Sequence, residues 1–392
     1  MIQFLLDITV YASFAFIMSF FARMSCQECG SNSKRIDLWL WMYILFFTFI
    51  SAIRWNVGTD SPSYFITFLT GDSYVGTKDN EHIWELWQNF IYTNGIYPAI
   101  GLGGAAFVQI FFLTDALKRY RRILIALPFI LFGSHYFADY SNAVRQMMAA
   151  SIFVWGTQFI IKRKLIKYLL TILLASSFHH SAIALSIIYF IPIGIDTSKY
   201  RWQWIGILTG CLIVGRTPSF QHFADTINYL IVLIGYDNYE DRVSQMLSGG
   251  YDDETLGFGP MMLSFYLIGI FIMWYGPKLK ETFGNHIPQF NLWYLLSNSY
   301  ICIYFLICNI SHIFIRPTMY FELFQMIIAS MLLLYFISRK YKYALYATSY
   351  YLIISVCCIW DTWKAQDKPF ETSTYKTILT YPYKQEINHF RK

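Results

Sequence analysis

The chain has 392 residues, of which 56% are hydrophobic and 14% charged, and its formal net charge is +6. An average soluble domain carries about 25% charged residues, so this composition excludes an ordinary soluble protein and indicates a polytopic membrane protein. The lysines and arginines lie mostly in short clusters between apolar runs, which is typical of cytoplasmic loops and gives no reason to expect nucleic-acid binding.

The apolar runs predict an all-α protein with about twelve transmembrane helices. Residues 2–22 carry Asp7 and lack a basic start, so we expect a retained first helix with its N-terminus outside. One membrane domain then covers residues 1–360. Its remaining expected spans, in chain order, are 38–53, 98–117, 123–138, 147–161, a pair within 168–192, 202–215, 258–276, 291–310, 318–338 and 342–360.

The run 168–192 can be read as one span or as two short helices that meet near residues 177–181. Because cytoplasmic loops carry the excess of lysine and arginine, the number of crossings decides between them. A single crossing would place outside the later basic clusters at 199–201, 278–280 and 339–342. We therefore expect a hairpin of two short helices with His179 at its tip.

Three external segments follow from this threading. Within residues 54–97, the stretch 81–92 predicts a helix in the membrane interface, although an amphipathic helix packed on the bundle fits equally well. Its expected apolar face is Ile83, Trp84, Trp87, Phe90 and Ile91, opposite Glu85, Gln88 and Asn89. The other two external segments are the acidic loop 217–257 and the tyrosine-rich tail 361–392.

Several arginines fall on the external side, where the positive-inside rule does not explain their presence. They are Arg54, Arg145, Arg216 and Arg316. Guanidinium groups bind phosphate well, so these positions predict an anionic ligand. Asn142, Arg145 and Gln146 have i, i+3, i+4 spacing and would share one helix face. The alternative for this group is helix capping and interfacial anchoring.

The segment Arg54 to Tyr64 combines a cation with turn residues. Gly58 would let backbone approach a ligand, Thr59 or Asp60 would cap the next helix, and Pro62 suits the first turn of that helix. The alternative is a structural ion pair between Arg54 and Asp60.

His179 suits a general base that accepts a proton from a sugar hydroxyl, with a merely hydrogen-bonded histidine as the alternative. Arg316 begins an apolar run that also carries Tyr320, and it can be a ligand-binding cation or an interfacial anchor. No sequence motif for a metal or a phosphate loop is present, so we expect no metal and no cofactor. The acidic run 252–254 is more typical of a solvated loop.

The blocks Arg54-x-x-Val-Gly-Thr-Asp60-x-x-x-Tyr64, Asn142-x-x-Arg145-Gln146 and Phe178-His179-x-Ser181, followed by Arg316 and Tyr381-Pro-Tyr-Lys384, occur in this order. Together they resemble the EpsG-like family of Wzy-type polysaccharide polymerases. This resemblance implies a GT-C-like helical bundle with a periplasm-facing cavity in the bacterial cytoplasmic membrane.

The resemblance also implies an activity. Such enzymes transfer a growing glycan from a polyprenyl diphosphate carrier to the next lipid-linked repeat unit, without nucleotide sugar or obligatory metal. It implies that Arg54, Arg145 and Arg316 are substrate ligands, and that His179 or Asp60 is the base. Membrane lipids, the lipid-linked oligosaccharide and a chain-length regulator are the implied partners. The remaining candidate substrate contacts are Tyr64, Asn142, Gln146, Arg216 and Tyr320.

Three other functions fit parts of the sequence. A flippase for lipid-linked oligosaccharides would also need many spans and anion-binding arginines, but transporters tend to show repeated halves and midplane charges. A membrane acyltransferase would need a histidine on the side of its acyl donor. A non-catalytic scaffold leaves the external polar residues unexplained. The sugars, the linkage and its stereochemistry stay open.

Overall fold

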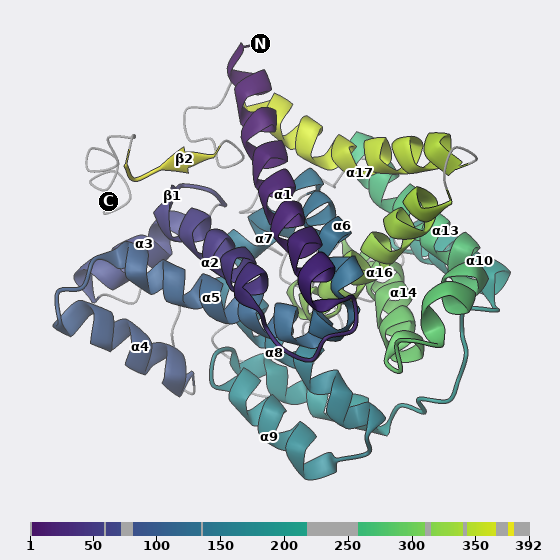
Figure 1. The fold of residues 1–392 in the computed structure, drawn as a ribbon, viewed down its shortest axis with the longest axis horizontal. Coiled ribbons are helices and arrows are strands. Elements are labelled where there is room, and N and C mark those ends of the chain that lie inside the picture. Colours follow the sequence, from purple (N-terminus) through teal and green to yellow (C-terminus); the bar gives the residue numbers. More distant parts are fainter. Residues whose placement is uncertain are drawn as a thin grey trace.

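The computed structural model describes residues 2–58, 60–71, 81–134, 136–217, 258–309, 315–339, 343–365 and 375–379. Within these ranges the chain is almost entirely helical (Figure 1). Among the described residues, five stretches are long and apolar enough to cross a membrane, namely Leu5–Cys29, Pro98–Gly133, Pro260–Gly284, Phe290–Ile307 and Arg316–Ser338. The chain is therefore a helical membrane protein, as its composition predicts.

The first half of the described chain supplies the helices that carry most of the candidate site. They are α1 (Ile2–Cys29), α2 (Leu38–Ile53), α3 (Ser61–Thr70), α4 (His82–Thr93), α5 (Pro98–Leu117), η1 (Lys118–Tyr120), α6 (Arg121–Gly133), α7 (Tyr136–Asn142), α8 (Val144–Ile161), α9 (Leu165–Ser176) and η2 (His180–Phe190). Helix α1 packs on α6, α2 packs on α5, and α8 lies between α5 and α9.

The second half adds a group of helices around α14 and α16. They are α10 (Arg201–Val214), α13 (Pro260–Leu279), the π-helical turn η4 (Lys280–Gly284), α14 (Phe290–Ile307), η5 (Arg316–Thr318), α16 (Met319–Ser338) and α17 (Ala344–Ala365). Helix α16 packs against α14, α6 and α8, so it joins this group to the first half.

The run 168–192 is divided into two helical pieces, as expected. Helix α9 ends at Ser176, and the chain then turns into η2, which is a 3-10 helix rather than an α-helix. The Tyr168 hydroxyl donates to the Leu185 carbonyl, and the Arg163 guanidinium donates to the Tyr189 carbonyl at 3.0 Å. The start of α9 thus lies beside the end of η2, so the two pieces form an antiparallel hairpin with His179 at the bend.

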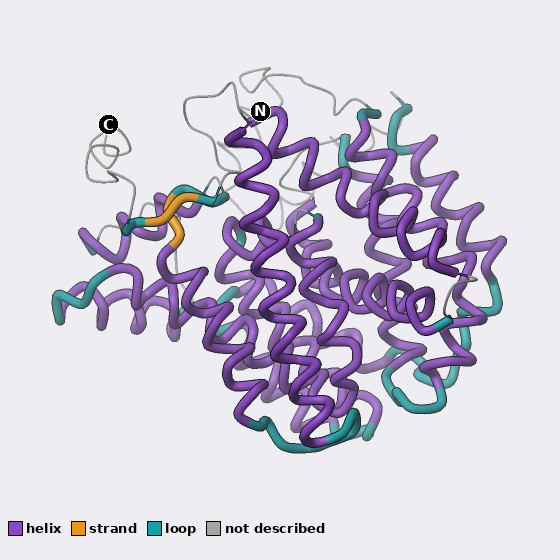
Figure 2. Tube along the Cα trace, turned by 45° about the horizontal axis from the view of Figure 1, so that its top comes forward, coloured by secondary structure: helices purple, strands orange, loops and turns teal. Residues whose placement is uncertain are grey.

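A short strand pair departs from the expected all-α fold. β1 (Arg54–Trp55) pairs antiparallel with β2 (Lys376–Thr377), and Arg54 lies opposite Thr377. Figure 2 shows both strands near the N-terminal end of α1. The Tyr375 hydroxyl donates to the Ile50 carbonyl, and its ring contacts Phe14 of α1 with 4.8 Å between centroids. These contacts bring the described part of the tail back to the segment that follows α2.

A buried ionic cluster joins α1, α2 and α6 where the basic loops meet. The side chain of Arg121 is fully buried and pairs with Asp37, and it also donates to Ser25 and to the Arg35 carbonyl. Asp37 in turn accepts the Leu40 backbone N–H at 2.9 Å and caps α2. One arginine therefore fixes the ends of three helices.

We predict that Arg121→Ala lowers the thermal unfolding temperature of the purified protein strongly, because it leaves Asp37 buried without its cation. Breaking a buried pair in this way costs about 3–5 kcal/mol. Arg119→Ala is the control, since Arg119 is exposed on the same turn. Equal unfolding temperatures for the two variants would contradict a structural role for the Arg121 cluster.

Candidate active site

A carboxylate that the sequence analysis did not select lies at the centre of the polar residues. Glu81 is buried, pairs through Oε2 with Arg145, and lies with Oε1 2.7 Å from Nδ1 of His179. From the sequence, Glu81 is expected only to be the first residue of an amphipathic helix. The one sign in the sequence that Glu81 could be functional is its position as an acidic residue directly before an apolar helical stretch.

Backbone contacts hold Glu81 against the bend between α9 and η2. The Ile83 N–H donates to the Ser177 carbonyl at 3.2 Å, so the first turn of α4 is tied to the end of α9. The His180 backbone N–H donates to Glu81 Oε1 at 3.3 Å. Because the irregular bend leaves these groups outside helical hydrogen bonding, they are available to position α4 and its preceding carboxylate.

The surroundings of Glu81 favour its ionised form. Burial alone would raise the pKa of this carboxyl, but the hydrogen bond with His179 and the charge of Arg145 outweigh burial, so the pKa of Glu81 lies below its usual value of 4.5. An ionised carboxylate can only accept hydrogen bonds. The ring nitrogen Nδ1 of His179 must therefore carry the proton in this contact.

Arg316 is a solvent-accessible cation in the cluster. Its side chain is 58% exposed, and its guanidinium lies 3.7 Å from Asp60. The amide of Gln146, which follows Arg145 on α8, donates to the Arg316 carbonyl. Thus the backbone of Arg316 is held by α8 while its guanidinium stays accessible, as required of a group that meets a ligand.

The residues around Asp60 are fixed by a close backbone approach. Gly58 has φ +85°, and a Cβ added there would lie 2.8 Å from Oδ1 of Asn142. The same Oδ1 accepts the Asp60 backbone N–H at 2.9 Å. The missing side chain of Gly58 therefore makes room for Asn142. The expected approach of the Gly58 backbone to a ligand stays a prediction. Asn142 thereby links α7 to the start of α3.

Two tyrosines complete the cluster. Tyr64 is buried on α3 within the electrostatic influence of Arg145, Asp60 and Arg316, and burial raises the pKa of its phenol. Tyr320 on α16 shares a 2.8 Å hydrogen bond with the Ser181 hydroxyl, and its ring centroid is 6.3 Å from that of His179. Helices α3, α8 and α16 and the start of η2 therefore meet around His179.

Arg54 differs from the other expected ligands because it is inaccessible. It is 3% exposed, and its guanidinium donates to the Ser51 carbonyl. Nε has no hydrogen-bond partner among the residues that the structure describes. Burial lowers the pKa of Arg54 to about 10, so it remains a cation at neutral pH. The alternative ion pair between Arg54 and Asp60 is not formed, since Asp60 faces Arg316 instead.

Three other expectations need correction. Asn142 does not share a helix face with Arg145 and Gln146, because α7 ends at Asn142 and α8 begins at Val144. Asp60 occupies the N-cap position of α3, but its side chain makes no capping hydrogen bond. Helix α4 forms where expected, but Gln88 of its expected polar face is buried together with Trp84 and Ile91.

Arg216 lies at the ends of other helices. Its guanidinium lies over the Phe258 ring, 5.2 Å from the centroid, and the adjacent Gly215 carbonyl accepts from Asn309 at 3.5 Å. These contacts place it beside the ends of α10, α13 and α14. Thr59, the loop residues 218–257 with their acidic run 252–254, and the motif 381–384 lie outside the described residues.

The charges of the cluster suit an anionic ligand. Arg54, Arg145 and Arg316 outnumber Glu81 and Asp60, which leaves a net positive charge when His179 is neutral. No group of metal-ligating side chains occurs within the described ranges. A site of this kind can neutralise an anion and accept a proton close to it.

Comparison with known families decides where this site belongs. A model of the EpsG family matches residues 37–384, which is most of the chain and includes every member of the cluster. The chain belongs to the EpsG family. This family is associated with polysaccharide polymerases, as the sequence motifs indicate. Comparisons with curated proteins and with solved structures give no match.

In this EpsG-family protein, we predict that Gly58→Ala destabilises the fold more than Gly95→Ala. Both glycines have positive φ, but only Gly58 has another residue in the space a Cβ would take. The backbone strain is of order 1–3 kcal/mol in each case, and displacement of Asn142 adds to it only at Gly58. Thermal unfolding of the two purified variants measures the difference, and equal losses would contradict the packing of Asn142 on Gly58.

Proposed function

We propose that the protein is a polysaccharide polymerase of the outer face of the bacterial cytoplasmic membrane. It transfers a growing glycan from a polyprenyl diphosphate carrier to the next lipid-linked repeat unit. Membership of the EpsG family supports the reaction class. The observation that carries the proposal is the placement of His179, held by Glu81, in the same cluster as the accessible guanidinium of Arg316.

The reaction needs charge neutralisation more than it needs a strong nucleophile. The lipid diphosphate is already an activated leaving group, so the enzyme must stabilise the negative charge that develops on it and position the acceptor hydroxyl. Arg145 is already engaged by Glu81. Arg316 is therefore the arginine that we place directly against the diphosphate, where its planar donors match phosphate oxygens.

His179 is the proposed base. In the transfer step, the acceptor hydroxyl oxygen forms a bond to the anomeric carbon of the donor sugar, and the bond from that carbon to the diphosphate oxygen breaks. The hydroxyl proton passes to Nε2 of His179, and the electron pair leaves with the lipid diphosphate. Asp60, the other candidate base, lies 3.7 Å from the guanidinium of Arg316 and is thus paired with the group that we place against the diphosphate.

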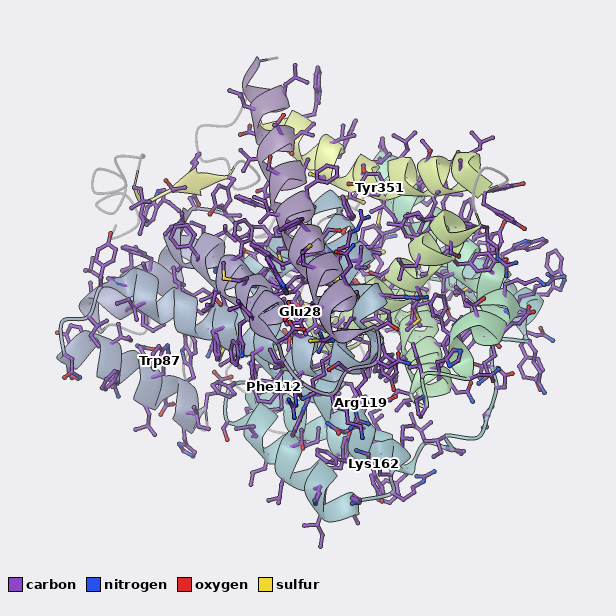
Figure 3. All side chains as sticks on the ribbon, viewed as in Figure 1. Glu28, Trp87, Phe112, Arg119, Lys162 and Tyr351 are labelled. Carbon is purple, nitrogen blue, oxygen red and sulfur yellow. The ribbon has the colours of Figure 1, made fainter. Side chains whose placement is uncertain are left out.

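An apolar groove beside the cluster suits the lipid chain of the substrate. It is shallow and is lined by one face of α4, with Ile83, Leu86, Trp87, Asn89, Phe90 and Thr93. Leu86 and Phe90 are exposed there. Trp87, labelled on the same helix in Figure 3, donates its indole N–H to the Gly101 carbonyl of α5 at 3.2 Å. Because Glu81 directly precedes α4, a prenyl chain in this groove would lead its diphosphate toward the cluster.

The test of the proposed function is polymerisation by purified protein supplied with lipid diphosphate repeat units and no nucleotide. We expect longer glycans on a gel and release of free lipid diphosphate. His179→Ala and Arg316→Ala should each reduce the rate by roughly 100-fold or more, as for loss of a general base or of a charge-stabilising donor. His286→Ala, at an exposed histidine on a distant loop, should leave the rate unchanged.

Movement of the lipid across vesicles without lengthening of the glycan would instead identify a flippase. Full polymerisation by both His179→Ala and Arg316→Ala, with normal expression, would show that this cluster is not the catalytic site.

The groove on α4 gives a separate prediction. Leu86→Ser and Phe90→Ser should each raise KM for substrates with a long prenyl chain by roughly tenfold or more, because each removes an apolar side chain whose burial by the prenyl chain contributes about 1.5–3 kcal/mol. KM for substrates with a short prenyl chain should not change. Leu345→Ser is the matched control, since Leu345 is equally exposed but lies on α17. A rise in KM that does not depend on chain length would contradict this placement of the lipid.

A further inference from the structure

We infer that Glu81 is a positioning residue that selects the proton-accepting form of His179, and that Arg145 acts through Glu81 rather than as a ligand of the diphosphate. This inference rests on the proposed function, and it assigns a role to a residue that the sequence motifs do not contain. It also changes the role expected for Arg145.

Glu81 fixes the tautomer of His179. A neutral imidazole carries its proton on one ring nitrogen and offers the lone pair of the other. Nδ1 lies 2.7 Å from Glu81 Oε1, and the carboxylate can only accept. The proton must therefore be on Nδ1, which leaves the lone pair on Nε2. The His179 side chain is 27% exposed, whereas that of Glu81 is 11% exposed, so the ring is more accessible than the carboxylate that holds it.

Arg145 keeps the Glu81 carboxylate ionised. A carboxylate buried without a cation tends to take up a proton, and a protonated Glu81 could donate to Nδ1. That reversal would move the histidine proton to Nε2 and remove the lone pair needed for a base. Arg145 pairs with Oε2 of the same carboxylate whose Oε1 meets His179. The arginine thus keeps Glu81 in the form that can only accept.

A backbone contact also holds the Glu81 carboxylate. The backbone N–H of His180 also donates to Oε1, so the orientation of the carboxylate is fixed on the side of the histidine as well as on the side of the arginine. Since Oε1 accepts from two N–H groups and Oε2 pairs with a guanidinium, the carboxylate has little freedom to rotate. A rigid partner of this kind orients the ring before substrate binds.

The decisive measurement is nitrogen-15 NMR of the full-length protein labelled at histidine, at about pH 9, where an unperturbed imidazole is neutral. Comparison with His179→Ala identifies the signals of His179. We expect the protonated-nitrogen signal at Nδ1 and the unprotonated signal at Nε2. In Glu81→Ala, the two tautomers should become mixed. A single unchanged tautomer in Glu81→Ala would overturn the inference, whatever the polymerisation assay shows.

Kinetics then separate the two roles of Arg145. Glu81→Gln should lower kcat by roughly 100-fold or more with little change in KM, since orientation of the base matters only in the transfer step. Arg145→Gln should also lower kcat, but it should add no further loss in the Glu81→Gln background. This double variant removes both charges, so it also serves where a single variant fails to fold.

A further loss of activity or a rise in KM on adding Arg145→Gln to Glu81→Gln would show that Arg145 contacts the substrate, and would overturn that part of the inference. If His179→Ala retains full activity, His179 is not the catalytic base, and the proposed mechanism is contradicted. If His179→Ala is inactive while Glu81→Gln keeps the wild-type kcat, only the role of Glu81 fails.

Discussion

The site depends on one buried carboxylate that joins three parts of the chain distant in sequence. Glu81 comes before α4, Arg145 lies in the first turn of α8, and His179 lies at the bend after α9. Burying a charged group is costly unless it is paired and hydrogen-bonded, so each partner of Glu81 is needed for the others to remain in place. The same contacts that stabilise the bend therefore also orient the histidine.

A second set of contacts places the accessible cation beside this carboxylate. The absence of a side chain at Gly58 admits Asn142, which holds the backbone at Asp60, while Gln146 holds the backbone at Arg316. Arg316 and the carboxylate it faces, Asp60, thus have their backbone positions set by amides on neighbouring elements. The two arginines differ in their surroundings. Arg145 is buried and paired with the Glu81 carboxylate, whereas Arg316 is exposed and lies 3.7 Å from Asp60.

Much of this arrangement could be predicted from the sequence because charge and hydropathy act over long stretches. The positive-inside pattern indicated the break in 168–192, and the structure confirms an antiparallel pair there. The same pattern placed Asp60, Arg145, His179 and Arg316 together, and they do gather in one cluster. Their roles in catalysis stay predictions. Glu81 escaped notice because a single acidic residue before a helix has no pattern of its own.

Two features of the fold could not be predicted because they leave no periodic pattern in the sequence. The break between Asn142 and Val144 interrupts a helical spacing that looked continuous, and the strand pair at Arg54 requires a partner more than three hundred residues away. The face of α4 was also misjudged, because Gln88 is buried by tertiary packing that the hydrophobic pattern alone does not report.

The most direct test of the central claim is an electron cryomicroscopy map of the protein in a lipid nanodisc with a sugar-linked prenyl diphosphate bound. The account predicts diphosphate density against the guanidinium of Arg316, with the sugar toward Nε2 of His179 and Arg145 still paired with Glu81. Diphosphate density beside Arg216 or in the basic loops around Lys118, with none at Arg316, would contradict it.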